Sequence, residues 1–392
     1  MQTFAILGSH PDLSMAEITA QTGAIATTSA GEVALFEDLQ GNFIDLLSKL
    51  GGTQKIGYVI GEVAKVDGAE LIAFLTSQLE QETRETKLHF GISIYDFGQT
   101  SAVQKLYAQS RIIGMTVKSN LKTAGRSARF VMSKEPALNA VSVAQNDLIA
   151  KGAEFVLLAA KDKVVIGMTS AVQDANDWSE RDFGRPRRNA KQGMLPPKLA
   201  RMMINLTGTS AKNKSILDPF CGSGTVLMEG AMLGAAKVIG SDIASGAVHD
   251  TQHNMAWLKE RGIKVGEVDV FMAKASEVSN RLPENTVDMI ITETYLGLPR
   301  RGVETTVDLY KAVDYIETLY TESFSTLRGV LKENGIVIIA APVHYLDGQT
   351  FEAPVVRILE GLGYTHSPLP HEPLIYHREG QLVGRRFFRF TK

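Results

Sequence analysis

The clearest pattern of hydrophobic and polar positions lies in the C-terminal half of the chain. From about residue 206 onward, short aliphatic runs alternate with longer segments of helical periodicity, and the runs predict strands near residues 215, 237, 268, 287 and 335. Strands that alternate with helices are typical of a doubly wound parallel sheet. The β-rich segments 373–377 and 385–390 predict a terminal antiparallel hairpin. We therefore expect an α/β domain over 206–392.

The N-terminal half has a different pattern, in which short strands and helices follow no regular alternation. Residues 1–55 combine an apolar start at 4–7, a helix start at Ser14 and an apolar run at 33–36. Residues 56–170 contain candidate strands at 56–66 and 88–95, candidate helices at 68–79 and 137–151, and a hairpin of 155–158 and 164–168 around a turn at 161–163. These patterns predict two small α+β domains.

Residues 171–205 differ from both halves. They are rich in arginine and are interrupted by Pro186, Pro196 and Pro197. Proline removes a backbone donor and disfavours a continuing helix. We therefore expect an extended basic linker over 171–205.

Composition supports a globular protein of more than one domain. The chain has 392 residues, of which 44% are hydrophobic and 21% are charged. The single cysteine, Cys221, excludes an intramolecular disulfide and a cysteine metal cluster. His249 and His253 are four residues apart, which fits a surface pair on a helix better than a metal site, so no metal is expected. The N-terminus has no basic leader and the apolar runs are too short to cross a bilayer, so a cytoplasmic protein without a membrane partner is expected.

Positive charge is concentrated locally, although the net charge is only −2. Residues 101–134 carry seven cations and no acid, and the predicted linker carries a second group of arginines. Either group could be a solvated surface or a surface that binds a polyanion. The candidate contacts to nucleic acid are Lys105, Arg111, Lys118, Lys122, Arg126, Arg129, Arg185, Arg187 and Arg188.

A glycine-rich turn follows the first predicted strand of the C-terminal half. Residues 218–225 have the sequence Asp-Pro-Phe-Cys-Gly-Ser-Gly-Thr and precede a segment of helical pattern. Gly222 and Gly224 can adopt positive φ and let a ligand approach the backbone where the first amides of the helix face outward. About 20 residues later a second apolar strand ends in Asp242, which can accept hydrogen bonds from both hydroxyls of a ribose. This spacing predicts a nucleotide site.

The charge of the turn limits the kind of nucleotide. Asp218 stands at its head and no Gly-Lys-Ser/Thr sequence follows, so a phosphate is disfavoured and a cationic ligand fits better. An ordinary α/β turn with an incidental aspartate is the alternative.

The turn resembles the S-adenosylmethionine loop of amino-methyltransferases, which methylate exocyclic amines of adenine, cytosine or guanine. The resemblance implies that Asp218 faces the methionine ammonium and that Asp242 binds the ribose. The cofactor contacts that the resemblance implies are Asp218, Phe220, Cys221, Gly222, Ser223, Gly224, Thr225, Asp242 and Ile243.

The order of the parts is similar to that of the THUMP-domain RNA methyltransferases, and within them to the tRNA guanosine-10 N2-methyltransferase group. The similar segments are 4–8, 13–18, 50–57, the THUMP-like 88–170, 185–188 and the distinctive 194–202. The resemblance implies a ferredoxin-like and THUMP-like N-terminal module that captures tRNA, followed by a Rossmann-like methyltransferase domain that uses S-adenosylmethionine. It leaves open whether a small activating subunit joins a chain that is otherwise a monomer.

The catalytic motif of that family is altered in this chain. The family's Asp-Pro-Pro-Tyr aligns with Glu293, Thr294, Tyr295 and Leu296. The reaction needs a carboxylate and a backbone carbonyl that accept hydrogen bonds from the target amine, and Glu293 can serve with a longer side chain. The family's aromatic residue stacks on a flipped base. Leu296 holds that place here, so Tyr295 would have to turn inward to replace it.

A second departure follows the third predicted strand. Lys274 and Ala275 stand where the family commonly has an acid and an alanine beside the adenine, and a protonated lysine cannot accept a hydrogen bond. Ser276, Glu277 or a backbone carbonyl could take that role.

The sequence therefore predicts an S-adenosylmethionine-dependent tRNA methyltransferase that acts on an exocyclic amine, first of all N2 of guanosine 10. Two alternatives stay open. A DNA adenine or cytosine amino-methyltransferase shares the glycine turn, although residues 1–170 resemble a tRNA-reading module. The altered motif also allows a protein that binds tRNA without methylating it.

Overall fold

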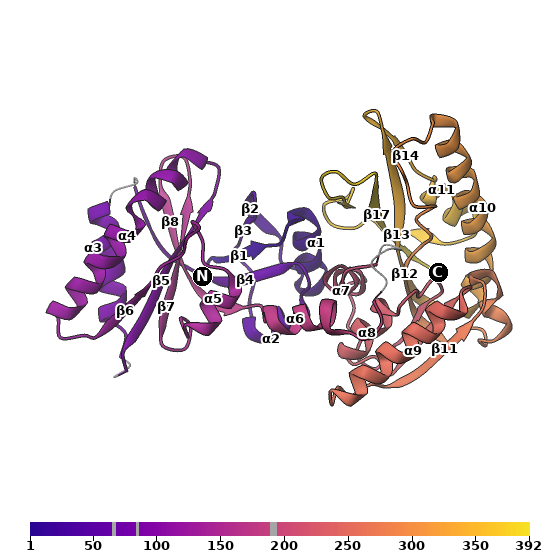
Figure 1. Ribbon diagram of the computed structural model, residues 1–392, viewed down its shortest axis with the longest axis horizontal. Coiled ribbons are helices and arrows are strands. Elements are labelled where there is room, and N and C mark those ends of the chain that lie inside the picture. The colour runs from indigo at the N-terminus through magenta and orange to yellow at the C-terminus, as the bar shows by residue number, and fades with distance from the viewer. Residues whose placement is uncertain (65–67, 84–85, 189–193) are drawn as a thin grey trace. The chain divides into compact units, whose positions relative to one another are not determined.

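The computed structural model describes residues 1–64, 68–83, 86–188 and 194–392, which form two compact units (Figure 1). The first unit contains residues 1–15 and 22–177, and the second contains residues 16–21 and 178–392. Each unit is built on its own sheet.

The first unit has an eight-stranded sheet of order β2-β3-β1-β4-β8-β7-β5-β6. Its strands are β1 (Thr3–Leu7), β2 (Ala26–Ala30), β3 (Val33–Phe36), β4 (Thr53–Val63), β5 (Leu88–Asp96), β6 (Ala128–Val131), β7 (Gly152–Ala159) and β8 (Val164–Val172). Its helices are α2 (Phe43–Lys49), α3 (Gly68–Glu80), α4 (Thr100–Thr123) and α5 (Ala140–Gln145). Helix α1 (Pro11–Thr22) is divided, because residues 16–21 belong to the second unit. In place of the helix expected over 137–151, the structure has the shorter α5.

The long strand β4 joins the N-terminal residues to the rest of this unit. It pairs antiparallel with β1 along one edge and with β8 along the other. The boundary expected after residue 55 therefore lies inside a strand, and a single continuous sheet spans the two α+β domains that the sequence predicted. Val66, the expected end of this strand, lies outside the described residues.

Helix α4 presents two chemically different faces. Figure 1 shows α3 and α4 side by side, and both pack on the sheet through an apolar cluster that includes Leu75, Leu106 and Phe155. The opposite face of α4 is exposed and carries cations. Spacings of seven and four residues place Arg111, Lys118 and Lys122 along one stripe of that face.

The second unit contains a sheet of order β11-β10-β9-β12-β13-β17-β15, with β14 paired to β13 and β16 paired to β17. Its strands are β9 (Ser215–Asp218), β10 (Lys237–Asp242), β11 (Glu267–Met272), β12 (Val287–Glu293), β13 (Leu331–Leu346), β14 (Gln349–Phe351), β15 (Thr365–His366), β16 (Ile375–Tyr376) and β17 (Val383–Thr391). Its helices are α7 (Pro197–Asn205), α8 (Thr225–Met232), α9 (Ser245–Glu260), the short 3-10 helix η3 (Ala275–Asn280), α10 (Thr306–Val330) and α11 (Val355–Gly361).

The five strands from β11 to β13 are parallel, and β17 runs antiparallel beside β13. The predicted fold class, a parallel α/β sheet with an antiparallel end, is confirmed. Strand β16 also pairs antiparallel with β17, as the terminal hairpin pattern predicted. The chain runs from β9 outward to β10 and β11, then returns to β12 on the other side of β9. A sheet of this kind binds ligands at such a switch point, beyond the carboxyl ends of the strands.

The segment predicted as an extended basic linker is helical over much of its length. It contains α6 (Ala175–Ser179), a π-helical turn η1 (Glu180–Gly184) and α7. Pro196 and Pro197 do not prevent α7 but begin it, because proline is well tolerated in the first helical turn. The guanidinium groups of Arg181 and Arg201 are both buried against the carboxylate of Glu229, at 2.7 Å. The prediction of an extended linker is therefore wrong for these residues, and most of this segment belongs to the second unit.

Candidate active site

The turn between β9 and α8 requires both of its glycines, for different reasons. Gly222 and Gly224 have φ values of +52° and +82°. A Cβ atom at Gly224 would lie 2.7 Å from Cγ2 of Thr251, whereas a Cβ atom at Gly222 would meet nothing within 4 Å. Packing therefore excludes a side chain at Gly224, while Gly222 leaves open space beside the turn where a ligand can approach the backbone.

Helix α9 holds this turn through buried polar side chains. The hydroxyl of Thr251 donates to the carbonyl of Gly222 at 2.8 Å, and the amide of Asn254 donates to the carbonyl of Ser223 at 2.8 Å. Asn254 also exchanges two hydrogen bonds with the backbone of Arg187, at 2.9 and 3.0 Å. Because Thr251 and Asn254 are fully buried, these bonds fix the shape of the turn before any ligand binds.

Asp242 ends strand β10 beside the turn. Its Oδ2 accepts a hydrogen bond from the amide of Gly222 at 3.0 Å, and its Oδ1 accepts one from the amide of Ala244 at 2.9 Å. A carboxylate has about four acceptor positions, so each oxygen can still accept from a ligand hydroxyl. The backbone amides thus orient the Asp242 carboxylate and leave acceptor positions on both oxygens for a ligand.

Asp218, at the head of the turn, is almost fully buried. Its Oδ1 accepts hydrogen bonds from the hydroxyl of Thr292 at 2.7 Å and from the amide of Phe220 at 3.1 Å. Burial raises the pKa of Asp218 to about 7, although these two hydrogen bonds oppose the shift; the nearby carboxylates of Asp242 and Glu293 raise it further. Asp218 therefore exchanges its proton near neutral pH and favours a cationic partner that would stabilise its charge.

The altered motif begins directly beside this turn. Strand β12 runs parallel to β9, with Ile290 opposite Leu217, and the Thr292 hydrogen bond joins the two strand ends. Glu293, the last residue of β12, follows immediately. The turn and the motif therefore share the carboxyl edge of the sheet.

Glu293 is paired with an arginine from the antiparallel end of the sheet. Its Oε1 accepts from Nε of Arg385 at 2.5 Å, and the two side chains are only 14% and 9% exposed. Burial raises the pKa of Glu293, while the charge and hydrogen bond of Arg385 oppose the shift. Arg385 thus helps to keep a buried carboxylate ionised.

The next residues of the motif point in different directions. The hydroxyl of Thr294 lies 2.5 Å from the hydroxyl of Tyr320, inside the core under α10. Tyr295 is partly exposed and contacts Tyr315 of α10 edge-on, with ring centroids 5.7 Å apart. Leu296 is half-buried. The inward turn that would let Tyr295 replace the family's stacking residue is not the conformation of this structure.

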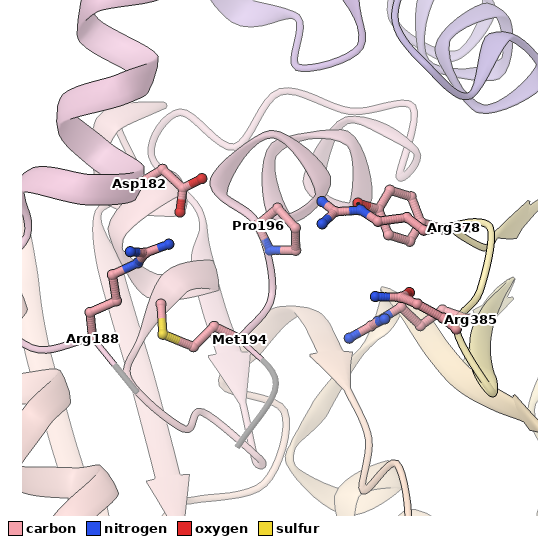
Figure 2. A pocket seen from close by; sticks show the side chains of 8 residues that line it. Asp182, Arg188, Met194, Pro196, Arg378 and Arg385 are labelled. Atoms are coloured by element: carbon pink, nitrogen blue, oxygen red, sulfur yellow. Dashed lines mark hydrogen bonds between the residues drawn. The ribbon is translucent and has the colours of Figure 1, made fainter. Parts of the chain in front are cut away.

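A small cavity of about 260 Å³ adjoins Arg385. Figure 2 shows Asp182 and Arg188 on one side of it and Arg378 and Arg385 on the other. Tyr376 forms part of its wall, and its hydroxyl accepts a hydrogen bond from Nε of Arg378 at 2.7 Å.

Comparison with known proteins relates this site to methyltransferases. A family model for the RMKL-like methyltransferase domain matches residues 185–345. The tRNA (guanine(10)-N2)-dimethyltransferase of Methanothermobacter thermautotrophicus is 37% identical over 155 residues, which are 40% of each chain. That of Methanocaldococcus jannaschii is 32% identical over 188 residues, 46% of this chain and 48% of the relative. A probable enzyme of the same name from Methanothermococcus thermolithotrophicus is 33% identical over 147 residues, which are 37% of this chain and 79% of the relative. The chain belongs to the tRNA (guanine(10)-N2)-dimethyltransferase family.

The extent of these matches differs from one comparison to the next. The chain spans less than half the length of the first two relatives. A model for a DNA methylase also matches, over residues 97–253, a range that crosses the boundary between the two units. The crystal structure of TrmN from Thermus thermophilus covers all of both chains with a TM-score of 0.55 at 16% identity. The structure of SMU.472, a putative methyltransferase complexed with SAH, has a TM-score of 0.50 at 12% identity. These two similarities establish a shared fold.

Several residues expected to contact a cofactor lie near Asp242. The amide of Ala273 donates to the carbonyl of Asp242, so the segment after β11 runs beside it. Ile243 and Met272 are both about two-thirds exposed. Ala275 is buried, and Lys274 is exposed with its ammonium 3.8 Å from Glu277. The structure therefore brings an aliphatic surface, rather than an acid, to the end of β11.

Within the turn, some expected contacts are available only through the backbone. The thiol of Cys221 is buried, where Sγ lies 3.8 Å from the hydroxyl of Thr251, and burial raises its pKa. The hydroxyl of Thr225 accepts a hydrogen bond from Arg185. Phe220 and Ser223 are half-buried. The side chains of Cys221 and Thr225 thus serve packing inside the unit.

The expected nucleic-acid contacts separate into exposed and buried residues. Lys105, Arg111, Lys118, Lys122 and Arg129 are exposed on the first unit, while Arg126 is half-buried. Arg187 and Arg188 are exposed on the second unit. Arg185 is different: it is buried, and its Nη1 donates to Thr225 at 2.7 Å. The expectation that Arg185 contacts nucleic acid is therefore wrong in this conformation, because its guanidinium is committed to the start of α8.

Two negative findings apply to the described residues. In that part of the chain, His, Cys, Asp and Glu side chains form no group of three or more that could hold a metal ion. His249 and His253 stack on α9 with ring centroids 4.1 Å apart. Across the described ranges, no helix has the length and apolar character needed to cross a membrane.

The sequence predicts no role in the site for Thr251, Asn254 or Arg385. Thr251 and Asn254 are three residues apart on the helix after Asp242, which is the only local signal of a shared face. Arg385 is separated from Glu293 by 92 positions. No sequence pattern predicts such a pairing.

Proposed function

We propose that the chain is an S-adenosylmethionine-dependent tRNA methyltransferase that methylates an exocyclic amine, N2 of guanosine 10. The observation that carries the proposal is the Thr292–Asp218 hydrogen bond, which joins the ends of β9 and β12. Through it, a cofactor turn and a carboxylate motif meet at one edge of the sheet. The substrate is taken from the relatives, which are tRNA (guanine(10)-N2)-dimethyltransferases.

The cofactor fits the residues of the turn. Asp242 would accept hydrogen bonds from the ribose hydroxyls with its remaining acceptor positions. Asp218 would face the methionine ammonium, and the open space at Gly222 admits the ligand close to the backbone. The exposed side chains of Ile243 and Met272 would cover the adenine ring. Its amino group would be bound by Ser276, Glu277 or a backbone carbonyl instead of an acid at position 274.

The acceptor would be a base rotated out of the RNA helix. Glu293 and the backbone carbonyl of Thr294 would accept hydrogen bonds from its amine, which turns the nitrogen lone pair toward the methyl group. A cofactor bound at the turn would supply the methyl group on a sulfonium and would be released as a neutral thioether. Glu293 and the carbonyl of Thr294 would hold the attacking amine, whose proton would pass to water. No covalent enzyme intermediate is required.

Two basic surfaces would bind the RNA in this function. The exposed cations of the first unit, from Lys105 to Arg129, and the pair Arg187 and Arg188 would contact the tRNA backbone. The THUMP-like character of the first unit and a small activating subunit stay predictions from the resemblance.

The test uses the full chain, tritium-labelled S-adenosylmethionine and an unmodified tRNA transcript. We expect methyl transfer to the transcript and its loss when guanosine 10 is replaced. Glu293→Ala should retain cofactor and tRNA binding while transfer falls about 100-fold or more, because an acceptor that acts in the transition state is removed. The control is Glu322→Ala, an exposed glutamate on α10 that should behave as wild type.

Three outcomes would contradict the proposal. Transfer to DNA in preference to tRNA would favour the DNA amino-methyltransferase. Binding of tRNA without transfer would favour the catalytically silent protein. Normal turnover by Glu293→Ala would refute the role of Glu293.

A further inference from the structure

The cavity beside Arg385 is built from arginines. Arg188, Arg378 and Arg385 line it, with Asp182 as the acid of the lining. Guanidinium groups present planar pairs of N–H donors that match the oxygens of a phosphate. Lined in this way, the cavity favours an anion.

Tyr376 holds two of the arginines in place and does not offer a surface on which a base could stack. It is 6% exposed, so its ring is not available as a stacking surface. The guanidinium carbons of Arg378 and Arg385 lie 5.4 and 5.9 Å from the ring centroid, and Arg378 also donates to the hydroxyl. Among the described lining residues, Arg378 and Arg385 are thus held against Tyr376 and no aromatic face is open to a base, which indicates a phosphate rather than a nucleobase.

Arg385 connects the cavity to the altered motif. Its Nε donates to Glu293, while its side chain also lines the cavity. A guanidinium has five N–H donors, so one arginine can hold Glu293 with Nε and an anion with its terminal nitrogens. A ligand in the cavity would therefore lie one side chain away from the proposed acceptor of the target amine.

We propose that this cavity binds a phosphodiester group of the RNA next to the target nucleotide, and that Arg385 is a positioning residue that connects the bound phosphate to Glu293. The proposal rests on the proposed function. Binding of the phosphate fixes Arg385, and Arg385 fixes the carboxylate of Glu293. The bound phosphate would thereby give a second anchor to an arginine that already holds Glu293.

The test compares Arg378→Ala and Arg188→Ala with Arg357→Ala, an exposed arginine on α11 that serves as the matched control. Binding of unmodified tRNA is measured by fluorescence anisotropy across a range of KCl concentrations. Each cavity variant should flatten the salt slope of log K by about 0.7 to 0.9, the value for one lost phosphate contact. Arg357→Ala should keep the wild-type slope, and cofactor binding should stay unchanged in all three.

The role of Arg385 is tested separately, by steady-state kinetics. Arg378→Ala should raise KM for tRNA with little change in kcat, whereas Arg385→Ala should lower kcat as well, because Glu293 loses its partner. Arg385→Lys keeps the charge and serves if the alanine variant does not fold, as judged by its Tm. It should restore part of kcat.

The cavity proposal and the proposed function can fail separately. If wild type methylates tRNA but the cavity variants match Arg357→Ala in slope and KM, the cavity proposal is overturned and the function stands. If wild type binds tRNA without methylating it, the function fails, and the salt slopes still decide whether the cavity holds a phosphate.

Discussion

Asp218 shows how one buried carboxyl can make a binding site sensitive to pH. Its pKa of about 7 exceeds the usual value because burial penalises the charge more than Thr292 and Phe220 stabilise it. A carboxyl whose pKa is raised on folding binds more protons in the folded than in the unfolded protein. The free energy of unfolding therefore falls as the pH rises through the interval between the usual pKa and about 7.

The first prediction concerns cofactor affinity. If Asp218 faces the methionine ammonium as proposed, a cationic cofactor needs its ionised form, so calorimetry should find binding about tenfold tighter at pH 8 than at pH 6. Asp218→Asn can keep the hydrogen bonds from Thr292 and Phe220 while removing the charge. It should bind more weakly, with little pH dependence.

The same variant tests the stability argument. In the absence of cofactor, the Tm of wild type should decline between pH 5 and pH 8, and Asp218→Asn should remove part of that decline. For the affinity experiment, an equal pH dependence of cofactor binding in wild type and Asp218→Asn would show that Asp218 does not face the positive charge of the cofactor.

At the scale of elements, the two glycines of the turn between β9 and α8 should differ in their effects on stability and on cofactor binding. Gly224→Ala would bring a Cβ atom against Thr251 and force an L-residue into the left-handed region, which alone costs roughly 1–2 kcal/mol. Gly222→Ala pays a similar conformational cost but meets no protein atom.

The matched pair of glycine variants gives a second prediction. Gly224→Ala should lower the free energy of unfolding by more than Gly222→Ala, as measured by urea denaturation. Gly222→Ala should lose cofactor affinity beyond what its stability explains, because its new methyl group occupies the open space beside the turn. Cofactor binding by Gly222→Ala at wild-type strength would move the ligand away from this turn.

The sequence predicted those elements whose signals are local. The alternation of strands and helices, the glycine turn and Asp242 all follow from neighbouring residues. The helices of 171–205 did not, because their stability depends on Glu229 of α8, which lies 48 positions from Arg181 and 28 from Arg201. The burial of Arg185 and the pairing of Glu293 with Arg385 were hidden for the same reason.

At the scale of the whole molecule, the proposed chemistry and the main basic surface lie in different units. The stripe of Arg111, Lys118 and Lys122 belongs to α4 of the first unit, while the cofactor turn belongs to the second. If α4 contacts the tRNA backbone, its cations should affect RNA affinity without affecting cofactor affinity.

A triple variant with Arg111, Lys118 and Lys122 changed to alanine tests this separation. We expect weaker tRNA binding and a salt slope reduced by about 0.7 to 0.9 for each lost contact. The control is a second triple variant in which Lys49, Lys151 and Lys163 are changed to alanine. These lysines form exposed ion pairs in the same unit. An equal effect of both triple variants would show that only net charge matters.

The buried carboxylate of Glu229 limits where this protein can be divided. Arg181 and Arg201 both precede residue 206, the expected start of the methyltransferase domain, yet both pair with Glu229 on the helix that follows the glycine turn. A fragment that begins at residue 206 would lack both ion-pair partners of Glu229 and would uncover the surface of α8 on which α7 packs. The second unit should therefore fold only when the helices that precede residue 206 are kept with it.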